Sequence, residues 1–182
     1  MSNIKRYILV GILPIIILVS MTITPLNTYL NGVEIVIETM PYDPRDVFRG
    51  DHVVLNYKIN EVDLDKLPAE FRNIDDINWH TMRNKKLYTV LVKKGDFYEV
   101  DYVTFEKPKN KLFLNARYQY PIWNYEDTKD KPELKGAFLS YNLDKYFVPE
   151  NTGRRLEDLS VRGKLKAKVK VLNGYSLLVD IF

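Results

Sequence analysis

The sequence contains no cysteine and only two histidines, His52 and His80. Without thiols the chain cannot form disulfides, thiolate metal sites or a lipid-modified cysteine. Neither histidine lies in a spacing typical of a zinc site, and the eight glycines are too scattered to form a phosphate-binding loop. We therefore predict no metal site and no cofactor.

Serine is scarce: after residue 26 the chain contains only Ser140, Ser160 and Ser176. None of them stands in a recognisable nucleophile setting. Paired carboxylates such as Asp75-Asp76 are plentiful, but acid–base catalysis needs two carboxylates held in different environments around a cleft. We predict no catalytic residue, and an enzymatic function stays open only as an alternative.

Charge is absent from one stretch, residues 7–26, which reads YILVGILPIIILVSMTITPL. Twenty helical residues span about 30 Å, the thickness of the hydrocarbon core of a bilayer. Lys5 and Arg6 directly precede this stretch and favour a cytoplasmic N-terminus. No small-residue cleavage pattern follows, so an uncleaved anchor is favoured over a signal peptide. The predicted organisation is a cytoplasmic tip (1–6), a transmembrane anchor (7–26) and an extracytoplasmic domain (27–182).

The formal net charge is +3. Removing the two anchor charges leaves about +1 for the extracytoplasmic part, whereas binding to a nucleic acid requires a basic surface. We therefore predict no nucleic-acid partner.

Period-two alternation of apolar and polar residues predicts β-strands after residue 32. Lys94-Gly95-Asp96 and Asn173-Gly174 are suited to hairpin turns, the second of them to type I′. Pro121 is expected to end one strand. The predicted strands are Val33–Met40, His52–Ile59, Leu87–Val92, Phe97–Phe105, Lys111–Tyr118, 164–171 and Tyr175–Ile181.

Two segments have helical spacing instead. Residues 63–84 predict one short helix or two, with a break at Pro68, and Thr152–Leu159 predicts another. Tyr120–Leu134 contains two prolines and mixed charges and is expected to be an exposed loop. The fold class is mainly β (α+β): an antiparallel sheet or partly open barrel with one or two short helices, preceded by one transmembrane helix.

Two side-chain groupings have both a structural and a binding interpretation. Lys164, Lys166, Lys168 and Lys170 alternate along one strand, which favours a solvated sheet face or a protected edge over a site for anionic polymers. The aromatic residues between 118 and 125 are favoured to pack a loop onto the sheet, although such side chains also stack on sugar rings. These aromatic residues are Tyr118, Tyr120, Trp123 and Tyr125.

Residues 41–57, PYDPRDVFRGDHVVLNY, combine a rigid turn with a dense run of alternating charges. Arginine can hold carboxylates in bidentate pairs, so a salt-bridged corner between two strands is the favoured interpretation. The alternative is a polar pocket for an anionic or polar ligand, with Glu150 and Arg154 as further members. The charged residues of the corner itself are Asp43, Arg45, Asp46, Arg49 and Asp51.

This stretch resembles the GDYXXLXY protein family, whose motif corresponds to residues 50–57, GDHVVLNY. Residues 146–153, YFVPENTG, are similar to the second signature of that family, Y-F-V-P-E-G-T-G. His52 and Asn151 replace a tyrosine and a glycine of these patterns. Leu55 and Tyr57 share the inward face of their strand with Val53, so we interpret these letters of the motif as packing residues.

The resemblance implies a bacterial membrane-anchored protein without an established activity, encoded beside multi-spanning membrane proteins. We therefore predict a single-pass protein of the bacterial cell membrane that acts as an extracytoplasmic interaction module. Its expected partners are the membrane, through residues 7–26, and a multi-spanning membrane protein. The alternative is an envelope ligand-binding protein or enzyme that uses the charged corner at 43–51.

Overall fold

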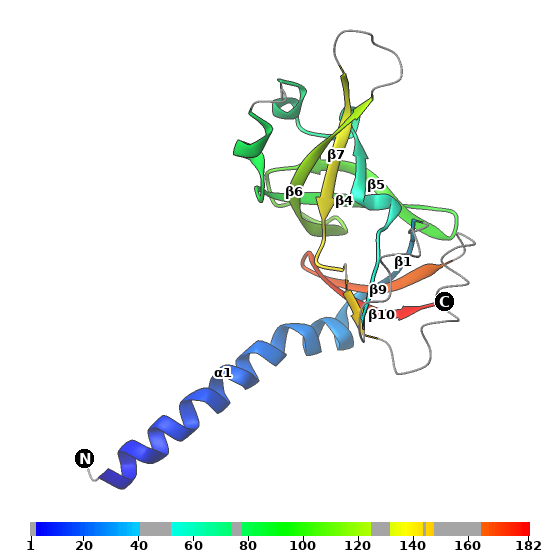
Figure 1. The fold of residues 1–182 in the computed structure, drawn as a ribbon. Coiled ribbons are helices and arrows are strands. Elements are labelled where there is room, and N and C mark those ends of the chain that lie inside the picture. Colours follow the sequence, from blue (N-terminus) through cyan, green and yellow to red (C-terminus); the bar gives the residue numbers. More distant parts are fainter. Residues whose placement is uncertain (1–2, 41–51, 74–77, 125–131, 144, 148–164) are drawn as a thin grey trace.

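The computed structural model describes residues 3–40, 52–73, 78–124, 132–143, 145–147 and 165–182. A long N-terminal helix projects from a β domain, and the C-terminus lies within that domain (Figure 1). The helix, α1 (Asn3–Asn31), contains Pro14 and Pro25 without a break. Within α1, Val10–Asn31 has a mean hydropathy of 1.9 and is long and apolar enough to cross a membrane; its most apolar part is unburied, whereas Thr28 near its end is buried. A signal sequence would meet the same criteria.

Ten described strands form two main antiparallel sheets and one short ladder. The order is β1-β9-β10 in the three-stranded sheet and β3-β7-β6-β4-β5 in the five-stranded sheet, and β2 pairs with β8. The strands are β1 (Val33–Glu38), β2 (His52–Val54), β3 (Glu61–Asp63), β4 (Lys86–Lys94), β5 (Phe97–Thr104), β6 (Phe113–Asn124), β7 (Glu133–Ser140), β8 (Lys145–Phe147), β9 (Lys166–Leu172) and β10 (Tyr175–Ile181). The five-stranded sheet ends at β3 and β5, so the described strands form open sheets and no closed barrel.

One hydrophobic core joins the two main sheets. Ile35 and Ile37 of β1 and Val169 of β9 lie in the same cluster as Leu91 of β4 and Leu114 of β6. These side chains come from alternate positions of their strands, which is how a half-buried antiparallel sheet presents its inner face. The core confirms the predicted alternation.

Both predicted hairpins are confirmed. Gly95 turns between β4 and β5 with a φ of 60°, and Asn173 and Gly174 turn between β9 and β10 with φ values of 52° and 85°. A type I′ turn needs a positive φ at both central positions, which asparagine and glycine tolerate best. At Gly174 an added Cβ would also meet Phe113 Cε2 at 2.4 Å.

The prediction that Pro121 ends its strand is wrong. The exposed loop predicted at Tyr120–Leu134 is wrong for residues 120–124 and 133–134, which belong to strands, and residues 125–131 of it lie outside the described residues. β6 runs on to Asn124, and Pro121 pairs with Ala137 of β7. The described pairing of β6 with β4 stops at Arg117, so Pro121 stands where β6 has a strand neighbour on one side only. A residue without an N–H group is compatible with such an edge.

The short helices predicted between residues 63 and 84 are 3-10 turns in the described part of this segment. These turns are η2 (Leu64–Lys66), η3 (Ala69–Asn73) and η4 (Trp79–Met82). A further 3-10 turn, η1 (Lys58–Asn60), ends the strand predicted at 52–59 early. The helix predicted at Thr152–Leu159 lies outside the described residues.

The lysines of β9 do not protect a sheet edge, because β9 is the central strand of its sheet. Lys166, Lys168 and Lys170 are half-buried rather than fully solvated. Lys168 pairs with Glu34 at 3.5 Å, and the Lys170 ammonium donates to the Tyr29 carbonyl at 2.5 Å. Part of this lysine face therefore holds the domain against the end of α1.

Candidate functional site

The charged corner predicted from the sequence lies outside the described residues, as do Glu150 and Arg154. The structure describes its flanks instead. His52 of β2 pairs with Phe147 of β8, and Val54 pairs with Lys145. His52 belongs to the first sequence signature, residues 50–57, and Phe147 belongs to the second, residues 146–153. The two sequence signatures therefore meet in one ladder.

Leu55 and Tyr57, two letters of the GDYXXLXY motif, are buried. The Tyr57 hydroxyl donates to the Leu143 carbonyl at 2.7 Å, and the Tyr57 backbone N–H donates to Asn60 Oδ1 at 2.6 Å. Tyr57 thus ties the segment after β2 to the segment after β7. The interpretation of both letters as packing residues is confirmed.

Two more side chains strengthen this connection. Asn60 Nδ2 donates to the Leu139 carbonyl at 2.7 Å, and the Tyr141 hydroxyl donates to the Ile59 carbonyl at 2.7 Å. Burial raises the pKa of Tyr141 well above its usual range, so the phenol stays protonated and remains a donor. Together with Tyr57, these side chains join residues 57–60 to residues 139–143.

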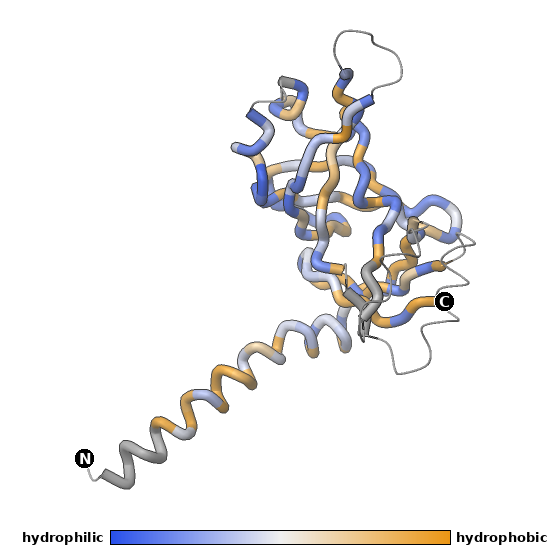
Figure 2. The backbone as a smooth tube through the Cα atoms, viewed as in Figure 1, coloured by the Kyte–Doolittle hydropathy of each residue, from blue (hydrophilic) through white to orange (hydrophobic). Residues whose placement is uncertain are grey.

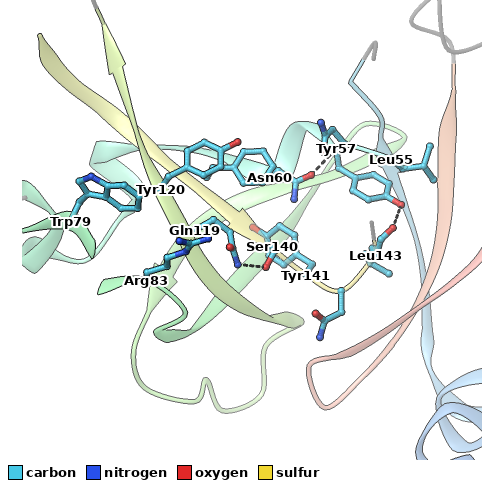
Figure 3. Close-up of a pocket in the computed structure, with 13 residues that line it drawn as sticks. Leu55, Tyr57, Asn60, Trp79, Arg83, Gln119, Tyr120, Ser140, Tyr141 and Leu143 are labelled. Carbon is cyan, nitrogen blue, oxygen red and sulfur yellow. Dashed lines mark hydrogen bonds between the residues drawn. The ribbon is translucent and has the colours of Figure 1, made fainter. Parts of the chain in front are cut away.

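A half-open groove of about 470 Å³ lies over this connection. Leu55, Tyr57 and Asn60 flank one end of it, Trp79 and Arg83 come from the η4 region at the other end, and β6 and β7 lie between them (Figure 3). The remaining lining residues are Asn56, Gln119, Tyr120, Phe138, Ser140, Tyr141, Asn142 and Leu143.

A stacked pair of aromatic rings lines part of the groove. Tyr120 stacks on Phe138 with ring centroids 4.8 Å apart and planes 10° apart, and 46% of Tyr120 is exposed. Burial, and secondarily the charge of Glu61, raises the pKa of Tyr120, so its hydroxyl is also a neutral donor. This ring pair offers a face for stacking next to hydrogen-bonding groups.

The aromatic residues around 120 therefore have separate roles, and the prediction that they pack a loop onto the sheet is wrong. Tyr118 is fully buried in the core, with its ring 5.2 Å from that of Phe71. Tyr120 faces the groove, and Trp123 belongs to β6 itself. Tyr125 lies outside the described residues.

The chemical character of the groove favours binding. Gln119 donates to Ser140 Oγ at 2.8 Å, and Arg83 adds a cation at the rim. The described lining contains amides, hydroxyls, aromatic rings and one guanidinium, with no carboxylate or imidazole. Such groups hold a polar ligand by stacking and hydrogen bonds. The part of the chain that the structure describes contains no cluster of three potential metal ligands.

The groove could not be predicted from the sequence, because the two strands that line it, β6 and β7, pair with a register shift. A register shift between Tyr118 and Tyr120 leaves Gln119 as an extra residue and pairs Tyr120 with Phe138. A bulge of this kind re-aims side chains. The alternating residues Tyr118 and Tyr120 are the sequence feature that indicates a strand here. Alternation alone does not show where the bulge lies, so it does not show that Tyr120 faces the groove.

The described residues define a class: an antiparallel β domain attached to one N-terminal apolar helix, with a groove partly lined by aromatic rings. A family model described as GDYXXLXY protein matches residues 14–181. The chain belongs to the GDYXXLXY protein family. No curated protein and no solved structure matches the chain significantly.

Proposed function

We propose that this protein is anchored in the bacterial cell membrane by α1 and that its β domain is an extracytoplasmic interaction module for an integral membrane protein. The observation that supports the anchoring is the exposure of the apolar side chains of α1 from Val10 onwards. Val10, Ile16, Leu18 and Ile23 are between 59% and 67% exposed. Exposing so much apolar surface to water is costly, whereas a bilayer would cover it.

The distribution of polarity along α1 supports the same proposal. The hydrophobic part of the helix is separated from the domain by turns of mixed polarity (Figure 2). Ser20 Oγ donates to the Ile17 carbonyl at 2.7 Å and Thr22 Oγ1 to the Leu18 carbonyl at 3.0 Å. These two hydroxyls are therefore satisfied within the helix, as a transmembrane segment requires.

Single cysteines test the topology, since the chain has none of its own. We expect Asp96→Cys, in the exposed β4–β5 turn, to react with an impermeant maleimide in spheroplasts. Ser2→Cys, the matched control in the N-terminal tip, should react only after lysis. The reverse pattern would refute the proposed orientation, and a mature protein whose mass lacks residues 1–26 would refute the uncleaved anchor.

The partner is tested by cross-linking in cells and purification in mild detergents. We expect the full chain to be recovered with a multi-spanning membrane protein. The substitution Tyr120→Ser in the groove should reduce this recovery, whereas Tyr175→Ser, at an exposed tyrosine that does not line the groove, should not. Recovery of the intact protein alone from several mild detergents would count against an interaction module.

The groove also supports a second candidate function, the binding of a soluble ligand. Trp79 lines the groove and reports on its occupancy by fluorescence. Titration with oligosaccharide and short-peptide mixtures should change this fluorescence in the wild type and not in Tyr120→Ser. An unchanged signal in both proteins would count against a soluble ligand of these two classes.

A further inference from the structure

A second hollow lies where the domain joins its anchor. It has a volume of about 430 Å³ and is lined by Val33 of β1, by the β9–β10 turn, and by the connection between β5 and β6. That connection contributes Lys107 and Lys111. The lining therefore combines two lysines with apolar residues and the β9–β10 turn.

The junction with α1 fixes where this hollow lies relative to a membrane. Val33 follows the last residue of α1 by two positions. The Gly32 N–H donates to the Thr28 carbonyl at 2.9 Å, and an added Cβ at Gly32 would meet that same oxygen at 2.4 Å. An added Cβ at Gly32 would also meet Lys170 Cβ at 3.2 Å, and the Lys170 ammonium donates to the Tyr29 carbonyl, so the domain has a fixed contact with the helix end rather than a free linker.

A helical rise of about 1.5 Å per residue then gives the depth. If the hydrocarbon ends at residue 31, Val33 lies about 3 Å outside it, and if it ends at residue 26, about 10 Å outside. Both values place the hollow in or directly above the lipid headgroups. The side chains of Tyr29, Leu30, Val33 and Tyr175 are exposed in this region, and tyrosine is typical of a membrane interface.

The lysines in and beside the hollow have no acidic partner among the described residues. Lys58, Lys94 and Lys168 each pair with a glutamate. In contrast, no described carboxylate forms a salt bridge with Lys107, Lys109 or Lys111. The segment 105–112, FEKPKNKL, holds these three lysines and one acid.

Contacts with aromatic rings hold two of these lysines, both of which line the hollow. The Lys111 ammonium lies 4.9 Å from the centroid of the Tyr102 ring, and the Lys107 ammonium lies 5.9 Å from that of Phe113. Such contacts order a long side chain at little electrostatic cost. The ammonium groups remain available to an anion.

We propose that this hollow binds the phosphate of an anionic phospholipid headgroup and thereby sets the orientation of the β domain on the membrane surface. The inference rests on the proposed membrane anchoring. Charge complementarity and the short, structured junction with α1 favour a lipid over a soluble anion, because a headgroup is held at this depth by the bilayer itself.

Lysine acylation of the full chain in nanodiscs tests the site. The discs contain phosphatidylcholine alone, phosphatidylcholine with phosphatidylglycerol, or phosphatidylcholine with added inorganic phosphate. We expect acylation of Lys107 and Lys111 to slow roughly fivefold in the anionic discs, the factor for about 1 kcal/mol per basic residue near an anionic surface. Lys93 and Lys135 are exposed on other strands and should react equally in all discs.

Two double variants test the site further, and the measured quantity is the acylation rate of Lys109. Its protection by anionic lipid should disappear in Lys107→Gln/Lys111→Gln and persist in Lys93→Gln/Lys135→Gln, which removes the same charge elsewhere. Equal acylation in anionic and zwitterionic discs would refute the lipid site and leave the membrane anchoring intact. Protection by inorganic phosphate without protection by anionic lipid would refute a lipid as the occupant. If the chain does not enter the discs, the anchoring proposal fails and the lipid site fails with it.

Discussion

The Tyr57 hydroxyl allows the most direct test of how the motif acts. Tyr57→Phe removes the donor that reaches the Leu143 carbonyl at 2.7 Å and changes no apolar volume. Tyr57 is 1% exposed, so water cannot replace the lost donor without rearrangement. An acceptor left unsatisfied in a buried site costs about 1–2 kcal/mol of unfolding free energy. For a domain of this size the Tm should fall by about 2–8 °C.

Tyr118→Phe is the matched control. Tyr118 is also fully buried, but its hydroxyl has no hydrogen-bond partner among the described residues. Removing a buried polar group that is unsatisfied in the fold should leave the unfolding free energy unchanged or raise it by up to about 1 kcal/mol. The same chemical change is therefore expected to have opposite or unequal effects at two buried tyrosines.

Urea and thermal unfolding of the full chain in one detergent, followed by tryptophan fluorescence, measures both variants. The denaturant slope should stay constant, so that midpoints report stability. A loss at Tyr118 as large as the loss at Tyr57, or no loss at Tyr57, would show that the Tyr57–Leu143 hydrogen bond does not stabilise this connection.

Three further predictions concern titration, the helix junction and the charged corner. Burial raises the pKa of Tyr118 to about 12, against about 10 in an unfolded chain. The phenol therefore ionises first in the unfolded chain, which should lower the stability of the folded state as the pH rises from 10 towards 12, and Tyr118→Phe should flatten this fall of the urea midpoint. Gly32→Ala, which would bring a Cβ to 2.4 Å from the Thr28 carbonyl, should lower the Tm by several degrees, whereas Gly11→Ala, with no atom within 4 Å of an added Cβ, should not. Arg45→Ala should lower the unfolding free energy by about 1–3 kcal/mol if the corner is salt-bridged; lost partner recovery at unchanged stability would instead support a pocket.

Local chemistry predicted the hairpins well. Asn173-Gly174 supplied both positive φ values of its turn, and the alternation from Leu165 to Val171 placed one face of β9 in the core. Each of these signals is contained within a few residues of the chain. The membrane-crossing potential of the N-terminal helix is equally local, because it depends only on length and composition.

The five-stranded sheet was harder to predict because its pairings are not local. β7 contains Lys135 and Gly136 and lacks a clear alternation, yet it lies between β3 and β6. At Gly136 an added Cβ would meet the Val62 carbonyl oxygen at 2.2 Å, so this glycine permits the close approach of β3. Such an approach becomes visible only when both strands are placed, which is also why the groove over β6 and β7 was not predicted.

The two sequence signatures acquire a common physical role from the β2–β8 ladder. Leu55 and Tyr57 hold the C-terminal side of the first signature in the core and against the end of β7. The N-terminal side then enters the ladder at His52, opposite Phe147 of the second signature. The hydrogen bond of Tyr57 therefore also holds in place β2, the strand that pairs the first signature with the second. Loss of the Tyr57 hydroxyl should disturb both signatures together, so hydrogen exchange at the β2 and β8 amides should rise in parallel in Tyr57→Phe and stay unchanged in Tyr118→Phe.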